Sequence, residues 1–260
     1  MTGVTQSRVL VSEWRKLRTL RSSWITLLVA FGLIVGLGLL VSAVTVSNWS
    51  HVGPEERASF DPVERSIGGL YLGQLAFLVL GVLFITGEYS TGMVRATFAA
   101  VPKRLPVLWA KLLVFLAVTL VLGTIACLLA FFGGQAIFAG RHLDTTLGAP
   151  GVARSVFGGG LYLCVIGLLG VSIGFLLRNT AGGIATMAAM MFVLPPLVDL
   201  LPHSWSTRIG PYLPTNAGAD LFVIHTDPYA LAPWTGFAVL CAYAVVAAAA
   251  AAVMLVRRDV

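Results

Sequence analysis

One motif has the spacing of a catalytic serine. Gly170, Ser172 and Gly174 form a G-x-S-x-G pattern, which in hydrolases presents a nucleophile on a sharp strand-to-helix turn with a histidine partner. Here the serine lies in the middle of a long apolar stretch that favours a continuous helix. The histidines all lie outside the apolar stretches, at His51, His142, His203 and His225. We therefore expect no enzymatic activity from this motif.

A second motif resembles a phosphate-binding loop. Gly87 and Gly92 have the separation of the two glycines in such a loop, but Met93 and Val94 stand where Lys and Ser or Thr must contact phosphate and Mg²⁺. We expect the chain to bind no ATP itself. The cysteines, Cys127, Cys164 and Cys241, lie singly in apolar stretches, and we expect them to be core residues and the chain to hold no metal or other cofactor.

Ion-coupled transport requires ionisable groups inside the bilayer. The candidate is Asp199, which follows Pro195 and Pro196 near the end of an apolar stretch. We expect an interfacial position for this carboxylate. The acidic pair Glu55 and Glu56 belongs to a loop, where a solvated face is the default expectation.

The elements that carry these residues are membrane spans. Of 260 residues, 58% are hydrophobic and 11% charged, against about a quarter charged in soluble domains. About 20 apolar residues cross a bilayer as a helix. Six stretches are long enough, which predicts one all-α membrane domain over residues 1–260. They cover residues 24–47, 67–86, 112–139, 156–177, 181–201 and 233–256.

The distribution of charge predicts the orientation. With six spans both termini lie on one side, and twelve of the seventeen Lys and Arg residues fall on that side against three acidic residues. Basic residues accumulate on the cytoplasmic side of membrane proteins, so we predict cytoplasmic termini. Arginine far outnumbers lysine, and together with abundant alanine and glycine this indicates a bacterial source.

The segment 9–23 precedes the first span and predicts an amphipathic helix on the membrane surface. Leu10, Trp14 and Leu17 fall at helical spacing, while basic residues occupy the other faces. A plain charge cluster that orients the first span would give the same composition. Within the spans, small residues recur at four-residue spacing and predict close helix packing or a dimer contact. The pairs are Gly32 with Gly36, Gly69 with Gly73, and Gly170 with Gly174.

The segment 87–111 joins spans two and three and reads GEYSTGMVRATFAAVPKRLPVLWAK, while 13–24 reads EWRKLRTLRSSW. These segments, the six-span plan and the long external segment before the last span resemble the ABC-2 type transporter permeases, over essentially the whole chain. The resemblance implies the transmembrane subunit of a bacterial ATP-binding cassette exporter in the cytoplasmic membrane. It also implies a separate ATPase subunit that holds ATP and Mg, and a second copy or a paralogue of the permease.

In that family the N-terminal helix and the segment after span two contact the ATPase. The resemblance therefore implies a coupling site of eleven residues. It also implies contacts with membrane lipids and no nucleic-acid partner. Glu88 and Arg95 are expected to support coupling, although Glu88 could simply pair with a nearby Arg or Lys. The members are Glu13, Trp14, Lys16, Arg18, Gly87, Glu88, Tyr89, Gly92, Arg95, Lys103 and Arg104.

Five prolines prevent the external segment 201–234 from forming one helix. The resemblance implies short re-entrant helices there, and a plain loop with aromatic anchors is the alternative. Two other function classes stay open: an ion-coupled secondary transporter and a membrane anchor subunit that transports nothing. Gln74 and Gln135 could line a path or serve helix packing. The substrate is not predicted.

Overall fold

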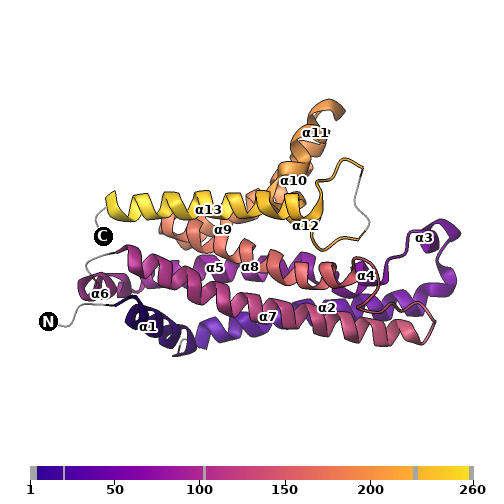
Figure 1. Ribbon diagram of the computed structural model, residues 1–260, viewed down its shortest axis with the longest axis horizontal. Helices are drawn as coiled ribbons and strands as arrows, with labels where there is room; N and C mark the ends of the chain where they lie inside the picture. Colours follow the sequence, from indigo (N-terminus) through magenta and orange to yellow (C-terminus); the bar gives the residue numbers. More distant parts are fainter. Residues whose placement is uncertain (1–4, 20, 102–103, 225–227, 258–260) are drawn as a thin grey trace.

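The computed structural model describes residues 5–19, 21–101, 104–224 and 228–257, without the side chains of residues 21–23, 95, 96 and 100. Every regular element in these residues is a helix, and six helical segments are long and apolar enough to cross a membrane. Most of them run along the long axis of the molecule (Figure 1). The chain is a multi-pass, all-α membrane protein with the six spans that its hydropathy predicts.

The spans agree with the predicted stretches to within a few residues, except that the third helix begins at Leu105 rather than at residue 112. They are α2 (Arg21–Asn48), α5 (Leu70–Ser90), α7 (Leu105–Ala139), α8 (Val152–Leu177), a fifth span of α9 (Thr180–Ala188), η2 (Ala189–Val193) and α10 (Leu194–Asp199), and α13 (Pro233–Arg257). The short helices are α1 (Gln6–Thr19), η1 (Trp49–His51), α3 (Pro54–Ala58), α4 (Pro62–Ile67), α6 (Met93–Ala100), α11 (His203–Ile209), η3 (Gly210–Tyr212) and α12 (Pro214–Ala219).

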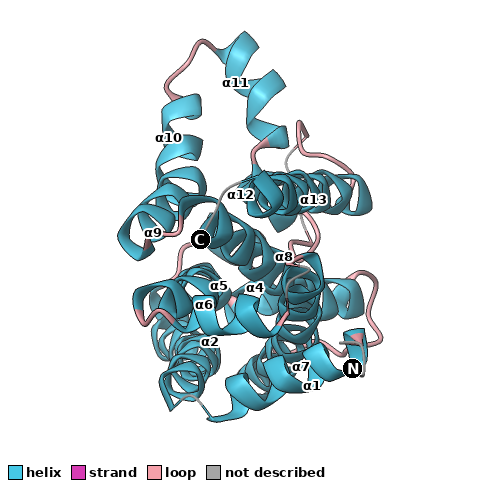
Figure 2. Cartoon of the chain, turned by 90° about the vertical axis from the view of Figure 1, so that its left-hand side faces the viewer, coloured by secondary structure: helices cyan, strands magenta, loops and turns pink. Residues whose placement is uncertain are grey.

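Helix α8 is the central span. Of its most apolar stretch 72% is buried inside the protein, against 28% for α2 and for α13. It packs against α5 on one side and lies between α7 and α13 (Figures 1 and 2). Glycines allow this packing: a Cβ atom added to Gly81 of α5 would lie 2.2 Å from the carbonyl oxygen of Gly167 in α8. The two backbones therefore approach more closely than larger residues allow.

Two of the three predicted glycine pairs lie in such contacts. A Cβ at Gly69 or Gly73 would meet Ile34 of α2, and one at Gly170 or Gly174 would meet α5. The pair Gly32 and Gly36 faces open space instead, with nothing within 4 Å of an added Cβ. The G-x-S-x-G motif is thus a packing motif within α8, and Ser172 donates to the carbonyl of Leu168 at 2.8 Å.

The buried amides stabilise the helix packing. The hydroxyl of Tyr162 donates to the Oε1 atom of Gln74, and both side chains are buried. The Nε2 atom of Gln135 donates to Ser66 Oγ at 3.1 Å, while its Oε1 accepts from the backbone of Thr145 at 2.7 Å. Buried polar groups that are paired in this way have little capacity left for a transported molecule. The structure therefore favours the packing role for Gln74 and Gln135.

The fifth span is interrupted by one π-helical turn. Pro195 has no N–H, so it cannot bond to the carbonyl of Met191 one turn earlier. The chain responds by widening into η2, where the N–H of Leu194 bonds to the carbonyl of Ala189. The hydroxyl of Thr215 in α12 donates to the Met191 carbonyl at 2.9 Å. Helix α12 therefore supplies the hydrogen-bond donor that Pro195 cannot give to the Met191 carbonyl.

Short helices follow the fifth span, as the prolines predict. Helix α11 projects from the bundle, whereas α12 packs against α13 and α8 (Figures 1 and 2). Arg154, at the start of α8, fixes the turn after α12 by donating to the carbonyls of Asp220 and Leu221, each at 2.9 Å. Asp199 ends α10 with an exposed side chain.

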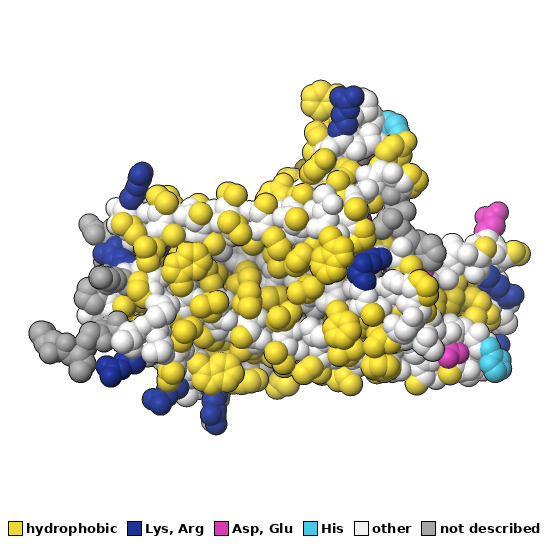
Figure 3. Space-filling model, in the orientation of Figure 1, with side chains coloured by type: hydrophobic (Ala, Val, Ile, Leu, Met, Phe, Trp, Pro, Cys, Tyr) yellow, Lys and Arg dark blue, Asp and Glu magenta, His cyan; other side chains and the backbone are white. Residues whose placement is uncertain are grey.

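Helix α1 lies at the same end of the bundle as α6 and the last turn of α13, and Lys and Arg side chains gather there (Figures 1 and 3). It covers residues 6–19 rather than the predicted 9–23. The face buried against the protein carries Val9, Glu13 and Leu17, whereas Trp14 is 46% exposed. The face packed on the protein therefore differs from the predicted apolar face of Leu10, Trp14 and Leu17, because the packed face includes a glutamate that finds cationic partners.

Candidate functional site

A buried ionic cluster lies where α1, α5, α6 and α7 meet. It consists of Glu13, Lys16, Glu88, Lys111 and Thr97. Glu13 and Lys16 come from successive turns of α1, Glu88 from the last turn of α5, and Lys111 from the second turn of α7. Elements separated by up to 98 residues along the chain therefore meet in a single group of side chains.

The two lysines bridge the two glutamates. Lys111 Nζ lies 2.5 Å from Glu13 Oε2 and 2.7 Å from Glu88 Oε1. Lys16 Nζ lies 2.7 Å from Glu13 Oε1 and 3.3 Å from Glu88 Oε1, and it donates to the Thr97 hydroxyl of α6 at 3.0 Å. With two positive and two negative charges, the cluster is formally neutral.

Burial makes this pairing necessary. Lys111 is 1% exposed, Glu13 is fully buried and Glu88 is 4% exposed. The ammonium group of Lys111 also lies 5.0 Å from the ring centroid of Phe84, within the range of a cation–π contact. An isolated charge in such surroundings would cost several kcal/mol, so each buried charge needs the opposite charges beside it.

Lys16 is the most exposed of the four charged residues of the cluster. Burial alone would lower the pKa of Lys16, but the hydrogen bond and the charge of Glu13, followed by those of Glu88, outweigh it and raise the pKa above its usual 10.5. Lys16 therefore stays protonated throughout the physiological range. The stabilisation that it provides is complete below pH 10.5 and is lost only as the pH rises through the raised pKa.

Glu88 serves both lysines with one oxygen. Its second oxygen, Oε2, is buried and has no hydrogen-bond partner among the residues that the structure describes, and the same is true of the neighbouring Tyr89 hydroxyl. The Tyr89 ring lies beneath the guanidinium of Arg178 at the end of α8, 5.4 Å away. The last turn of α5 is thus tied to α8 as well as to α1 and α7.

Of the eleven residues predicted for the coupling site, the structure brings Glu13, Lys16 and Glu88 together in this cluster. The alternative expectation for Glu88, an ion pair with a nearby basic residue, is confirmed by its contact with Lys111. Trp14 and Arg18 instead lie on the exposed side of α1.

The other predicted members surround the turn between α5 and α7. Gly87 and Tyr89 belong to the last turns of α5, and Gly92 immediately precedes α6 with a φ of 71°, which favours glycine. Arg104 Nη1 donates to the carbonyl of Leu255 in α13 at 3.1 Å. Arg95 lies on α6 but its side chain is outside the described part, and Lys103 lies outside the described residues.

The residue prediction did not include Lys111 or Thr97 among the site residues. Lys111 was placed at the edge of the third span, whereas α7 begins at Leu105 and carries it inside the protein. A signal was present in the sequence. Only three acidic residues lie among the twelve basic ones on the terminal side, and two of these three, Glu13 and Glu88, are the partners of Lys111.

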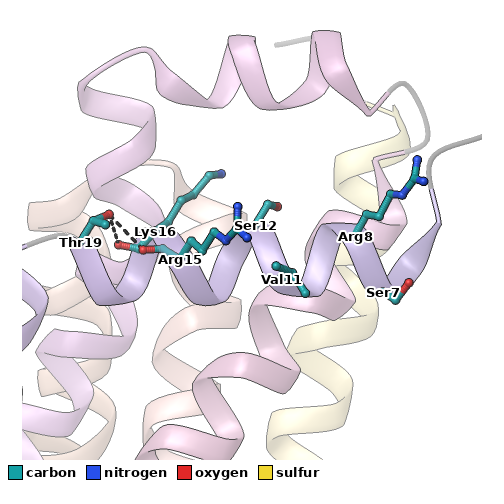
Figure 4. A pocket seen from close by; sticks show the side chains of 7 residues that line it. All are labelled: Ser7, Arg8, Val11, Ser12, Arg15, Lys16 and Thr19. Atoms are coloured by element: carbon teal, nitrogen blue, oxygen red, sulfur yellow. Dashed lines mark hydrogen bonds between the residues drawn. The ribbon is translucent and has the colours of Figure 1, made fainter.

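The outer side of α1 borders an open hollow of about 630 Å³. The side chains that line it all come from α1 and include Arg8, Ser12 and Arg15, which follow one another along one side of the helix (Figure 4). Lys16 belongs both to this lining and to the ionic cluster. The basic surface and the ionic cluster therefore share Lys16.

The chain was compared with known proteins by sequence. No protein-family model matches it, and no curated protein matches it either.

Proposed function

We propose that this chain is the permease subunit of an ATP-driven exporter in a bacterial cytoplasmic membrane, working with a separate ATPase that holds ATP and Mg. One observation carries the proposal: the ionic cluster joins the surface helices α1 and α6 to the spans α5 and α7. A displacement of α1 and α6 by a soluble partner would therefore reach two spans at once.

The energetics of the cluster favour a joint movement of its helices over a separation of α1 from α7. Separating a buried ion pair leaves an uncompensated charge, at a cost of about 3–5 kcal/mol. Glu13 and Lys111 are both almost fully buried, so moving α1 away from α7 would incur this free-energy cost. The four elements consequently move together, and ATP-driven closure of the partner would shift the spans between two arrangements.

The outer surface of α1 suits the proposed ATPase. Arg8 and Arg15 are exposed beside the hollow of Figure 4 and give this surface a positive charge. A complementary acidic surface would orient and accelerate docking. In this proposal Glu13, Lys16 and Glu88 position the helices, while Trp14, Arg18 and Arg95 contact the partner.

A second permease copy would cover surface that this chain leaves open. Only 22% of the most apolar stretch of the fifth span is buried. Leu197 of α10, Leu200 in the turn after it and Trp205 of α11 are exposed. In this proposal the second copy covers part of this apolar surface.

The test is to purify the tagged chain from its host in mild detergent and to assay the complex for ATP hydrolysis. We expect an ATP-binding cassette subunit to co-purify with vanadate-sensitive activity. Glu88→Gln keeps the shape of the side chain and removes its charge, so the vanadate-sensitive hydrolysis of the complex should fall by on the order of 5-fold or more. Glu56→Gln is the matched control, because Glu56 is an exposed residue outside the cluster.

Three results would contradict the proposal. Recovery of the chain alone, inert toward ATP, would remove the ATP-driven mechanism, and loss of transport in Asp199→Asn without any ATPase would assign ion-coupled transport instead. Equal hydrolysis by Glu88→Gln and Glu56→Gln complexes would show that the cluster has no part in coupling.

A further inference from the structure

A hollow of about 470 Å³ opens between α11, α12 and residues 229–230 of the segment before α13. It lies beyond the end of the fifth span, where α11 projects from the bundle and α12 packs on α13 (Figures 1 and 2). Its volume is in the range of sites for small organic molecules, about 300–1,000 Å³. None of the described residues that line it belongs to the ionic cluster or to the basic surface of α1.

The lining of the hollow carries two carboxylates. Asp199 comes from the end of the fifth span and Asp220 from the end of α12, and the described residues of the lining include no Lys or Arg. Helical spacing places Arg208 of α11 on the opposite face of that helix from the lining residues His203 and Ser206. The hollow therefore attracts cations and repels anions.

Asp199 lies at the unfavourable end of a helix. The fifth span runs from Thr180 to Asp199, and the C-terminal end of a helix carries a partial negative charge. Within the described part of the chain, the Asp199 carboxylate has no ion pair and no hydrogen bond that would offset this repulsion. A cation bound in the hollow would compensate both the carboxylate and the helix end.

The hydroxyl groups of the hollow face a ligand as acceptors. Ser206 and Thr207 both donate to the His203 carbonyl, at 3.2 Å and 2.7 Å, so each hydroxyl proton is already used. The Asp220 carboxylate is held in place by the N–H of Leu231, which donates to its Oδ2 atom at 3.2 Å. Such carboxylate and hydroxyl oxygens offer lone pairs, so a ligand that donates hydrogen bonds fits them.

Tyr229 supplies an aromatic wall. Its ring centroid lies 5.7 Å from that of His203 in an edge-to-face contact, and its side chain is exposed. The face of a tyrosine ring attracts cations, preferably organic ones and guanidinium groups. Pro211 and Ala219 add apolar contacts to the lining. These residues suit the carbon part of a ligand.

A metal ion fits the hollow less well than an organic cation. The described residues contain no group of three or more His, Cys, Asp and Glu side chains that could hold a metal ion. The hollow is also much larger than one ion with its ligands requires. The carboxylates, the acceptor hydroxyls and the aromatic ring together match an organic cation that carries N–H groups.

We propose that this hollow binds a small organic cation with a primary ammonium or a guanidinium group. The charged nitrogen lies beside Asp199 and Asp220, its N–H groups donate to carboxylate and hydroxyl oxygens, and its carbon part contacts Tyr229. The hollow lies at the end of the fifth span that is remote from the basic end of the bundle, so it opens on the side opposite α1 (Figure 1). Binding there does not depend on ATP-driven export.

Isothermal titration calorimetry on the full chain, purified in an uncharged detergent, tests the proposal. The probes are phenethylammonium and phenethyltrimethylammonium, which share their charge and their phenethyl group and differ in N–H donors. We expect saturable binding of one phenethylammonium, about tenfold tighter than that of the trimethyl compound. Absence of saturable phenethylammonium binding, or equal affinity for both probes, would overturn the proposal.

A pair of variants tests the location of the site. Asp199→Asn keeps the shape of an exposed side chain and removes its charge, so the affinity for phenethylammonium should fall about tenfold. Glu56→Gln removes the charge of an exposed carboxylate outside the hollow and should leave the affinity unchanged. Equal affinities of the two variants would overturn the proposal. Displacement of phenethylammonium by stoichiometric Ca²⁺ would assign the hollow to a metal ion instead.

Discussion

At the scale of single residues, Lys111 shows how a charge enters an apolar span. It lies in the second turn of α7 and is 1% exposed, which is tolerable because Glu13 and Glu88 lie 2.5 Å and 2.7 Å from its ammonium group. The partners come from α1 and α5, so the lysine is stabilised by tertiary structure and not by its own helix. Its presence in turn fixes the position of α1.

Lys111→Ala tests this dependence. It leaves Glu13 and Glu88 buried with only the partly exposed Lys16 between them, so the free energy of unfolding should fall by about 3–5 kcal/mol. Thermal unfolding in detergent measures the change. Arg15→Ala, an exposed basic residue on α1, should change stability by no more than about 0.5 kcal/mol. Similar values for both variants would show that the buried pairs contribute little.

At the scale of elements, helix interruptions and helix contacts follow from particular residues. In the fifth span, Pro195 removes one backbone donor, η2 widens the helix, and Thr215 supplies a substitute for the Met191 carbonyl. At the contact between α5 and α8, glycines have no side chain, so the two helix backbones approach each other directly. Both features arise because a backbone group needs either a hydrogen-bond partner or space.

Thr215→Val should destabilise the protein by about 1–3 kcal/mol, because the Met191 carbonyl loses its donor while the shape of the side chain is kept. Thr207, which is half-buried and whose hydroxyl donates to the His203 carbonyl in an exposed hydrogen bond, provides the same substitution as a control. In the background of Pro195→Ala, where Met191 regains a backbone donor, the cost of Thr215→Val should shrink. If Thr215→Val costs as much stability in that background, the Thr215 hydroxyl does not compensate for the donor that Pro195 lacks.

The same substitution, glycine to alanine, should change stability in opposite directions at two positions. Gly81→Ala places a methyl group 2.2 Å from the Gly167 carbonyl oxygen, which must separate α5 from α8 and should cost about 1–3 kcal/mol. Gly36→Ala meets nothing within 4 Å and should stabilise α2 by about 0.5–1 kcal/mol. Unfolding midpoints of the two variants would decide, and a loss of stability in both would contradict the packing assignment.

At the scale of the whole molecule, the two ends of the bundle differ in charge. Helix α1 and the last turn of α13 share the end where Lys and Arg gather (Figure 3), and α3 with Glu55 and Glu56 lies at the other (Figure 1). Basic residues favour the cytoplasmic side. This end should therefore face the cytoplasm.

Cysteine labelling in intact cells tests this orientation. In a chain with Cys127, Cys164 and Cys241 replaced by alanine, an impermeant maleimide should label Glu56→Cys in intact cells and Arg15→Cys only after lysis. Both positions are exposed, so access to the reagent decides the outcome. The reverse pattern would invert the predicted topology.

The sequence by itself determined the number of the spans and, apart from the start of the third, their approximate limits, because hydropathy and length are local properties of the chain. It also identified Glu88 and its neighbours as candidate site residues. Only the tertiary structure decided that Lys111 lies inside the protein, that the buried face of α1 carries Glu13, and that Gly32 and Gly36 face open space. These depend on which helices become neighbours, and pairings between residues far apart along the chain leave no periodic signal in the sequence.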